Sequence, residues 1–323
     1  MINRRTFLAT IAGGLLAAPL AGEAQAPAKV PTIGFLAGSQ NENATAFIQA
    51  LRDAGYVDGQ GVRIERRFYA AQVDQLPTFV NELVALKCDV ILATSAYAIR
   101  AATTATKTIP VVGIDLESDP VASGWARSLS RPGGNFTGLF LDLPELGGKL
   151  IQLLKEVEPG LSRVGAVWDS NVGNVQFRAT EAAARVATVA LQSLPIQRVE
   201  DFKDAFGRAS RKRLNGIIVL SSPLIFRQLS QIATLALTSR LPTISLFTLF
   251  SRSGGLMAYG PDFPEMFRRA VTYIDRILKG TKVSELPIER PSRFELVINL
   301  KTAKALGLTI PQSLLQRADQ VIE

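Results

Sequence analysis

A regular alternation of short apolar runs with amphipathic stretches constrains the fold more than any other feature of the sequence. The runs have the length of single strands, and the stretches between them place side chains such as Phe47, Leu51 and Ala54 on one helical face. Strands that alternate with helices predict a mostly parallel sheet covered by helices on both faces. We expect the first strands at 32–37, 62–69, 89–94, 111–115 and 136–141.

The same alternation starts again in the second half of the chain, without a residue-level repeat between the halves. A chain of 323 residues with 47% hydrophobic content can bury two cores, so a second α/β lobe is the simplest account. A third section returns to an apolar helical stripe from Met266 to Leu278, closed by Lys279 and Gly280, and then to a strand at 294–299. The second lobe is expected to hold strands at 164–168, 191–196, 217–220 and 243–247 and helices at 174–188, 200–213 and 224–240.

The first 26 residues have the pattern of a secretory signal. They begin with Arg4 and Arg5, continue as an apolar run over 7–21 and end in an Ala-Gln-Ala triplet at 24–26. The run is shorter than the about 20 apolar residues that span a bilayer, and an ordinary N-terminal helix is the alternative. The paired arginines are similar to those of twin-arginine export signals, while general secretion stays open. Since no cysteine lies near the cleavage region, we expect a mature protein in the periplasm, with the signal removed and no lipid anchor.

Composition argues against most enzyme chemistry. The chain contains no histidine, which removes the usual general base, the histidine-dependent nucleophile systems and the commonest transition-metal ligand. Its single cysteine, Cys88, lies among apolar residues and is expected to be buried and unreactive. The net charge of +8 comes with short basic clusters that match no nucleic-acid-binding motif, so we interpret them as solvated surface. We therefore expect no catalytic residue, no cofactor, no metal and no nucleic acid partner.

Polar side chains gather where the predicted strands end. In open parallel sheets small molecules bind at the carboxyl ends of the strands, where hydroxyls and helix N-terminal amides can receive a carboxylate and an aspartate can take an ammonium group. Each such residue alone is most often a helix cap, and only their gathering on two facing lobes indicates a ligand site. Tyr259 is a further candidate because 259–262 can cross between the lobes, although a plain strand-to-helix turn is the alternative. The candidates at strand ends are Ser39, Gln40, Thr94, Ser95, Asp115, Asp169, Asn171, Ser222 and Phe247.

Two motifs suggest other kinds of site. RPGGNFTGL at 131–139 is rich in glycine but matches neither phosphate-binding pattern, and we interpret 132–134 as a turn that leads into a strand. Asp115, Glu117 and Asp119 alternate as metal ligands sometimes do. The rest of a calcium loop is missing, and Asp119-Pro120 indicates the start of a helix, so only Asp115 is retained as a candidate.

Three segments together resemble a known family. They are RPGGNFTGL, GLMAYGPDFPEMFRRAVTYIDRILKG at 255–280 and, most specifically, FELVINLKTAKALGLTIPQSLLQRADQVIE at 294–323. They are similar to the ABC-transporter substrate-binding protein family with tryptophan/tyrosine-type members, over essentially all of 30–323. The resemblance implies an α/β fold of the type I periplasmic binding protein kind, with two doubly wound parallel-sheet lobes joined by a multi-strand hinge. The N-terminal lobe is then expected to comprise 27–142 and about 261–290, and the C-terminal lobe 143–260 and about 291–323.

The resemblance also implies a function. It implies a periplasmic solute-binding component of an ABC importer, which closes its lobes on an amino acid or related carboxylate and delivers it to a membrane permease with its ATPase. Hinge closure of this kind breaks no bond, and we expect a monomer. A ligand sensor that presents its closed form to a membrane receptor kinase is the alternative, and a carboxylate-dependent hydrolase is a third. The family's ligand contacts fall at Ser39, Thr94, Ser95, Asp115, Asp169 and Asn171 and, more weakly, at Ser222, Phe247 and Tyr259.

Overall fold

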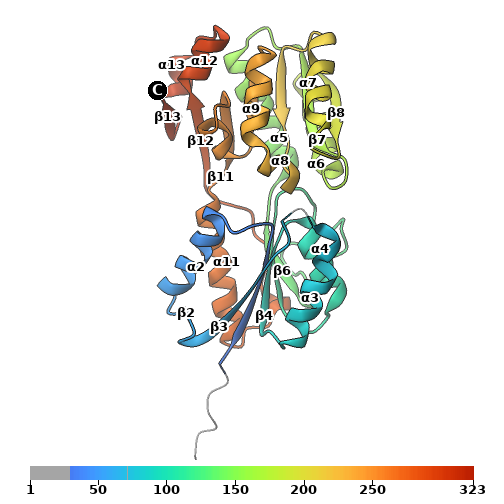
Figure 1. Cartoon of the computed structure of the whole chain (residues 1–323), viewed down its shortest axis with the longest axis vertical. Coiled ribbons are helices and arrows are strands. Elements are labelled where there is room, and N and C mark those ends of the chain that lie inside the picture. The colour runs from blue at the N-terminus through green and yellow to red at the C-terminus, as the bar shows by residue number, and fades with distance from the viewer. Residues whose placement is uncertain (1–29, 71) are drawn as a thin grey trace, which may run out of the picture. The chain divides into compact units, whose positions relative to one another are not determined.

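Two β-sheets organise the residues that the computed structural model describes, 30–70 and 72–323 (Figure 1). The expected signal segment at 1–26 lies outside the described residues. The chain builds the first sheet, moves to the second, returns to pack a helix on the first and ends in the second. No helix in the described ranges is long and apolar enough to cross a membrane.

The first sheet has the strand order β2-β3-β1-β4-β5-β6, and its strands pair in parallel. All residues of β1 are buried, because Phe35 packs against Phe47 of α2 on one face while Leu36 lies in the hydrophobic cluster of the other face. Helices α2 and α11 cover the first face, and α3 and α4 cover the second (Figure 1). The bounds are β1 Thr32–Ala37, α2 Glu42–Asp53, β2 Val57–Asp58, β3 Gly61–Phe68, the short 3-10 helix η1 Val73–Gln75, α3 Leu76–Ala85, β4 Val90–Thr94, α4 Ala96–Ala105, β5 Val111–Asp115, β6 Phe136–Phe140 and α11 Phe263–Leu278.

The second sheet has the strand order β13-β12-β11-β10-β9-β7-β8. Strand β12 runs antiparallel to β11, and the other neighbours pair in parallel. Helix α5 packs against α6, and α7 packs against α9. The bounds are α5 Leu143–Val157, β7 Arg163–Asp169, α6 Asn174–Val186, β8 Ala190–Ile196, α7 Asp201–Arg211, β9 Gly216–Val219, α8 Pro223–Arg227, α9 Leu229–Thr238, β10 Thr243–Ser245, α10 Thr248–Arg252, β11 Met257–Pro261, η2 Val283–Glu285, β12 Phe294–Asn299, α12 Leu300–Leu306, α13 Gln312–Leu315 and β13 Gln320–Ile322.

The strands expected from the sequence are confirmed, with ends that differ by at most two residues. The turn expected in RPGGNFTGL is also present, since Gly133 and Gly134 have φ values of +69° and +64° just before β6. Both sheets have helices on both faces in the way that the alternating pattern predicts.

Two local expectations were wrong. The helix expected over 224–240 is divided into α8 and α9, because Gln228 leaves helical geometry with φ −115° and ψ 15°. Asp119-Pro120 starts only a single turn, in which Asp119 Oδ1 accepts from the N–H groups of Val121 and Ala122. Gly124, with a φ of +73°, ends this turn before a helix can form.

Two of the connections between the sheets share the sequence Asp-x-Pro-Glu. One leads from β6 to α5 and the other from β11 to α11. In each, the aspartate begins the helix: Asp142 Oδ1 accepts from the backbone N–H three residues later at 3.4 Å, and Asp262 Oδ1 does so at 3.0 Å. The two halves therefore do share a short residue-level repeat, located at the crossings, which corrects the expectation of none.

The third connection, 286–293, runs beside β6 before it enters β12. Glu289 N donates to Gly138 O at 3.0 Å, and Glu289 O accepts from Phe140 N at 2.9 Å. Arg290 then pairs with Asp142 at 2.5 Å, so this segment contacts another crossing. The lobe ranges given above break within the first and third of these connections, whereas the break at 260/261 falls one residue before the end of β11. The independence of the lobes as folding units stays a prediction.

Gly138 is expected to be indispensable for the pairing of β5 with β6. A Cβ at this position would lie 2.1 Å from Gly113 O, a backbone atom of the neighbouring strand that cannot move without breaking the pair. Gly138→Ala should therefore lower the free energy of unfolding by about 3 kcal/mol. Gly148→Ala, on α5 with nothing within 4 Å of the new Cβ, should be neutral or stabilise by up to about 1 kcal/mol. Urea unfolding measures both, and a Gly138→Ala protein as stable as the wild type would contradict the close contact.

Candidate functional site

A pocket of about 750 Å³, part of it open to solvent, lies at the carboxyl ends of strands of the first sheet. Residues that follow strands of the second sheet complete it. The carboxyl-end rule used on the sequence therefore leads to an actual pocket; that its residues bind a ligand stays a prediction. Among the candidates, those that line it are Ser39, Thr94, Ser95 and Asp115 from the first lobe and Ser222 and Phe247 from the second.

The other four candidates do not line this pocket. Gln40 is exposed next to Ser39, and Tyr259 stacks on Phe294 with ring centroids 5.5 Å apart. Asp169 is buried, and its Oδ1 accepts from both the N and Nδ2 groups of Asn171 at 3.0 Å. Asp169 also forms a side-chain hydrogen bond with Ser222, a lining residue, so it lies directly behind the wall. The role of these four residues as ligand contacts stays a prediction.

One side of the pocket is aromatic. Phe226 of α8 and Phe247 after β10 meet edge to face with ring centroids 5.0 Å apart. Phe247 also stacks on Phe263, at the start of α11, at 6.0 Å. Phe35 and Phe267 complete this aromatic wall. A ligand with a flat apolar group would find contact area here without loss of a hydrogen bond.

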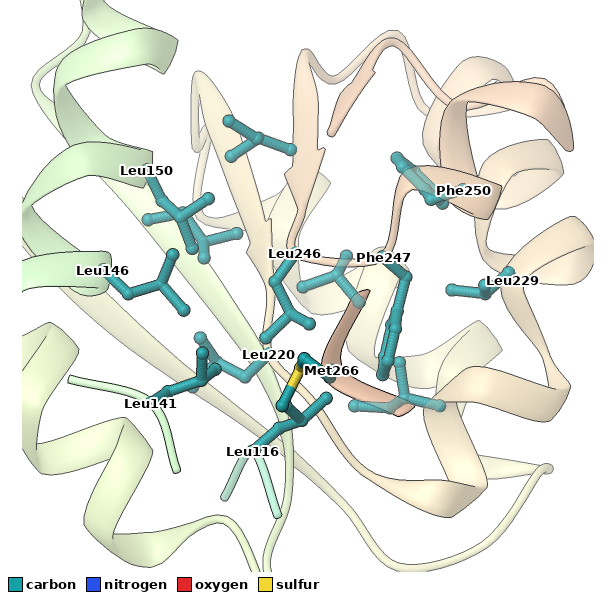
Figure 2. Packing of buried hydrophobic residues seen from close by; sticks show 14 of the residues in the cluster. Leu116, Leu141, Leu146, Leu150, Leu220, Leu229, Leu246, Phe247, Phe250 and Met266 are labelled. Carbon is teal, nitrogen blue, oxygen red and sulfur yellow. The ribbon is translucent and has the colours of Figure 1, made fainter. Parts of the chain in front are cut away.

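The aromatic wall adjoins a hydrophobic cluster to which both lobes contribute. Figure 2 shows Leu116, from the segment after β5, and Met266 of α11 near Leu220 and Leu246, which follow strands of the second sheet. All four side chains are buried. Burial of such side chains is worth about 1.5–3 kcal/mol each, so the two lobes share part of one core beside the pocket.

Helix α4 begins at the pocket with a strained residue. Ser95 has a φ of +90° and a ψ of 156°, a conformation that residues other than glycine rarely adopt. Its hydroxyl does not cap the helix but is hydrogen-bonded to the hydroxyl of the buried Tyr69 at 2.6 Å. The first turn of α4 therefore lacks a side-chain acceptor, and its N–H groups and dipole favour an anion in the pocket.

Buried polar groups join the two lobes next to the pocket. Gln176 of α6 donates from Nε2 to Leu116 O at 3.3 Å, and its Oε1 accepts from Ser221 N at 2.8 Å. The Ser221 hydroxyl in turn donates to Glu117 Oε1. One carboxamide thus bridges the segment after β5 in the first lobe and the segment after β9 in the second.

Acidic groups outnumber cations around the pocket. Asp115 and Glu117 are only 1% and 3% exposed. Asp115 Oδ2 accepts from Ser118 N at 3.0 Å, whereas its Oδ1 has no hydrogen-bond partner among the described residues. Burial raises the pKa of Glu117 well above its usual range and the charge of Asp115 raises it further, while the hydrogen bond from Ser221 opposes them. Burial also raises the pKa of Asp169.

Sequence reasoning missed five polar lining residues, Asn41, Asn43, Tyr69, Glu117 and Arg227, and the last three are the most informative. Tyr69 ends the strand expected over 62–69, so the carboxyl-end rule would have found it had this strand end been inspected. Glu117 was set aside with the metal motif, and this was wrong as a description of the pocket, because the chain turns after β5 and brings Glu117 inside. Arg227, which supplies the one cation among the described lining residues, comes from α8 and carries no sequence signal; its Nη1 donates to Ala70 O at 3.2 Å across the lobes.

The two tryptophans do not lie in the pocket. Trp168 stacks on Phe177 at 4.7 Å and donates to Ser193 Oγ, although it is the neighbour of Asp169 in sequence. Trp125 packs against Phe136. Within 30–70 and 72–323, no group of three or more acidic or cysteine side chains is arranged to hold a metal ion.

Comparison with known proteins identifies relatives for nearly the whole chain. The model of a family described as ABC transporter substrate binding protein matches residues 33–322. A tyrosine-binding protein of Clostridioides difficile is 28% identical over 268 residues, which cover 81% of this chain and 75% of the relative. The structure of an ABC domain in complex with L-Trp from Streptococcus pneumoniae is 25% identical with a TM-score of 0.83, over 90% of this chain and 99% of that chain. A conserved domain protein from Vibrio cholerae has the same fold, with 22% identity, a TM-score of 0.83 and coverage of 91% and 100%.

The backbone strain at Ser95 can be isolated with two variants. Ser95→Gly and Ser95→Ala both lose the bond to Tyr69, but only the alanine keeps a Cβ in the unfavourable conformation. The glycine variant should therefore be more stable than the alanine variant by about 1 kcal/mol or more. Urea unfolding gives the difference, and an alanine variant that equals or exceeds the glycine variant would show that Ser95 carries no strain.

Glu117 should make stability depend on pH with a predictable sign. Above about pH 4.3 the unfolded chain releases this proton, while the folded protein, in which the pKa is raised, retains it. The free energy of unfolding then falls as pH rises toward the folded pKa, by up to about 1.4 kcal/mol per unit. Glu117→Gln should lack this component and gain stability over the wild type as pH rises from 4.5 to 7.5.

Urea unfolding at several pH values measures this difference. Glu181→Gln is the matched control, because the hydrogen bond and charge of Arg178 and the charge of Arg185 lower the pKa of Glu181. That variant should lose stability relative to the wild type only as pH rises toward about 4.5, which is the opposite sign, and should run nearly parallel to the wild type from there to pH 7.5. Parallel pH curves for Glu117→Gln and the wild type would refute a proton held on Glu117.

Proposed function

The chain belongs to the ABC transporter substrate binding protein family, and from that premise we propose that it is the exported solute receptor of an ABC importer. It binds an amino acid or closely related small carboxylate between its lobes and delivers it to a membrane permease with its ATPase. The observation that carries the proposal is the composition of the pocket: an uncapped helix start, a buried acid and an aromatic wall face one space.

Each part of an aromatic amino acid has a partner in this pocket. The carboxylate would bind at Ser95 and the first turn of α4, with Arg227 as the nearby cation. The ammonium group would bind Asp115, whose Oδ1 needs a donor. The side chain would lie against Phe226 and Phe247. The relatives named as tyrosine-binding and as an L-Trp complex support a ligand of this class.

Transport requires that binding change the lobes. Because the polar partners lie mostly on the first lobe and Phe226, Phe247 and Arg227 lie on the second, one ligand contacts both and favours their approach. The crossings at Asp142 and Asp262 would serve as the hinge. The function needs no bond chemistry, which accords with a chain that has no histidine.

The proposed location is the periplasm. Its support is the sequence of 1–26, with paired arginines before an apolar run and a small-residue cleavage pattern. Export through the twin-arginine route would be tested by changing Arg4 and Arg5 to lysine and following the protein in periplasmic fractions.

Ligand binding is expected for L-tryptophan and L-tyrosine. Calorimetry and thermal unfolding are suitable measurements, because Trp168 and Trp125 lie outside the pocket and report poorly on it. A ligand at a hundred times its Kd should add about 2.7 kcal/mol of stability. Tryptamine, which lacks the carboxylate, and indole-3-propionate, which lacks the ammonium group, should each bind at least about tenfold more weakly than L-tryptophan.

Variants separate the site from the rest of the molecule. Asp115→Asn should abolish the preference for L-tryptophan over indole-3-propionate while the protein stays folded. Asp204→Asn, on α7 with the side chain 64% exposed, is the matched control and should leave affinity unchanged. Failure of folded, ligand-stripped protein to bind any amino acid would overturn the proposed ligand class, and an Asp115→Asn protein that binds as the wild type does would overturn the assigned role.

A further inference from the structure

We propose that Asp115 and Glu117 together form a cation subsite that exchanges a proton held on Glu117 for the ammonium group of the ligand. The inference rests on the proposed function for the identity of the ligand and deepens it. It predicts that binding releases a proton to solvent, which a simple ion pair with Asp115 would not do.

The two carboxyl groups are placed so that they cannot both be ionised without a cation. Both lie at the carboxyl end of β5 or just after it, both are buried, and both line the same pocket. An ionised carboxylate can only accept hydrogen bonds, so neither acid can stabilise the charge of the other without a proton or another donor. Burial and the charge of Asp115 raise the pKa of Glu117, so in the free protein a proton is held on Glu117 beside Asp115.

One buried oxygen of the pair can accept a further hydrogen bond. Asp115 Oδ1 is buried with no hydrogen-bond partner in the described ranges, while Oδ2 already accepts from Ser118 N. An unmade bond of this kind at a charged buried group is unfavourable. A proton on the pair or an ammonium group in the pocket can remove this cost, and the ammonium group offers three donors.

No other described group near Asp115 and Glu117 supplies the donor or the positive charge that the pair needs. Asp169, after β7, adds a third carboxyl. Burial raises the pKa of Tyr69, after β3, to about 12 and that of Tyr97, on α4, to about 12, so both phenols are neutral. Arg227, on α8, is the one cation among the described lining residues, and its Nη1 is hydrogen-bonded to Ala70 O. With more acids than cations, the pair needs either the proton or the ligand.

Exchange keeps the buried charge constant. Before binding, the pair with its proton carries one negative charge. After binding, two carboxylates and one ammonium group also carry a net charge of minus one. The proton leaves for solvent. Ionised Glu117 is then a stronger acceptor for the Ser221 hydroxyl than the neutral acid, because charge-assisted hydrogen bonds are stronger. Since Ser221 belongs to the second lobe, the exchange strengthens the contact between the lobes when the ligand arrives.

The test is calorimetric titration of the full-length exported protein with L-tryptophan in buffers of different ionisation enthalpy. The dependence of the apparent enthalpy on the buffer gives the number of protons released. We expect proton release that falls toward zero as pH rises, because Glu117 then loses its proton in the free protein. Glu117→Gln should bind L-tryptophan with no release at any pH, whereas Asp204→Asn should release as the wild type does.

The outcomes separate this inference from the proposed function. L-tryptophan binding with no proton release at any pH between 5 and 8 overturns the exchange and leaves the amino acid receptor intact. If L-tryptophan and L-tyrosine do not bind, tryptamine is the second probe: binding with proton release supports the subsite while the proposed ligand class fails, and no binding overturns both. If Glu117→Gln does not fold, the release measured for the wild type at two pH values still decides the question.

Discussion

The carboxamide of Gln176 is the contact on which the arrangement of the pocket depends. It is buried, donates across the lobes to Leu116 O and accepts from Ser221 N in its own lobe. A buried amide group that loses its partner costs about 1–3 kcal/mol, so the two segments are held at the separation at which both bonds form. At that separation the Ser221 hydroxyl reaches Glu117, and the residues after β5 become a wall of the pocket.

The hinge follows from the chemistry of its crossings. The two Asp-x-Pro-Glu segments begin α5 and α11 with a capping aspartate and a proline, which fix the first turn of each helix. Arg290 and Arg293 of the third connection pair with these same aspartates. Since the helices and strands on either side are regular, rotation between the lobes must be taken up in the few residues that join them. In the closure proposed above, the three connections would change together, because ion pairs join the third to each of the other two.

Much of the fold could be predicted because parallel strands have a clear sequence signature. Runs such as 111–115 are apolar throughout, and the polar residues that follow them mark the carboxyl ends. The rule failed where position depends on tertiary contacts. Asn171 satisfies the rule but turns back onto Asp169, and Arg227 enters the pocket only because α8 faces the other lobe. Tyr259 lies in β11 itself, where stacking on Phe294 decides its position.

Glu117 is the most instructive of these residues. In the sequence it is one of three acids at alternate positions, and the simplest interpretation is a carboxylate exposed to solvent. Its role depends on tertiary contacts. Ser221, 104 positions away in the chain, donates a hydrogen bond to it, and burial raises the pKa of its carboxyl group. The strained Ser95 and the acid pair both lower the stability of the folded protein, and both lie on the first lobe beside the pocket. The shared hydrophobic cluster with Leu116 and Leu220 offsets these unfavourable terms, and Leu116 also lines the pocket. Leu116 thus serves the core and the pocket wall at once, and the burial that it shares with Leu220 helps the neighbouring polar wall to carry groups that a core alone could not.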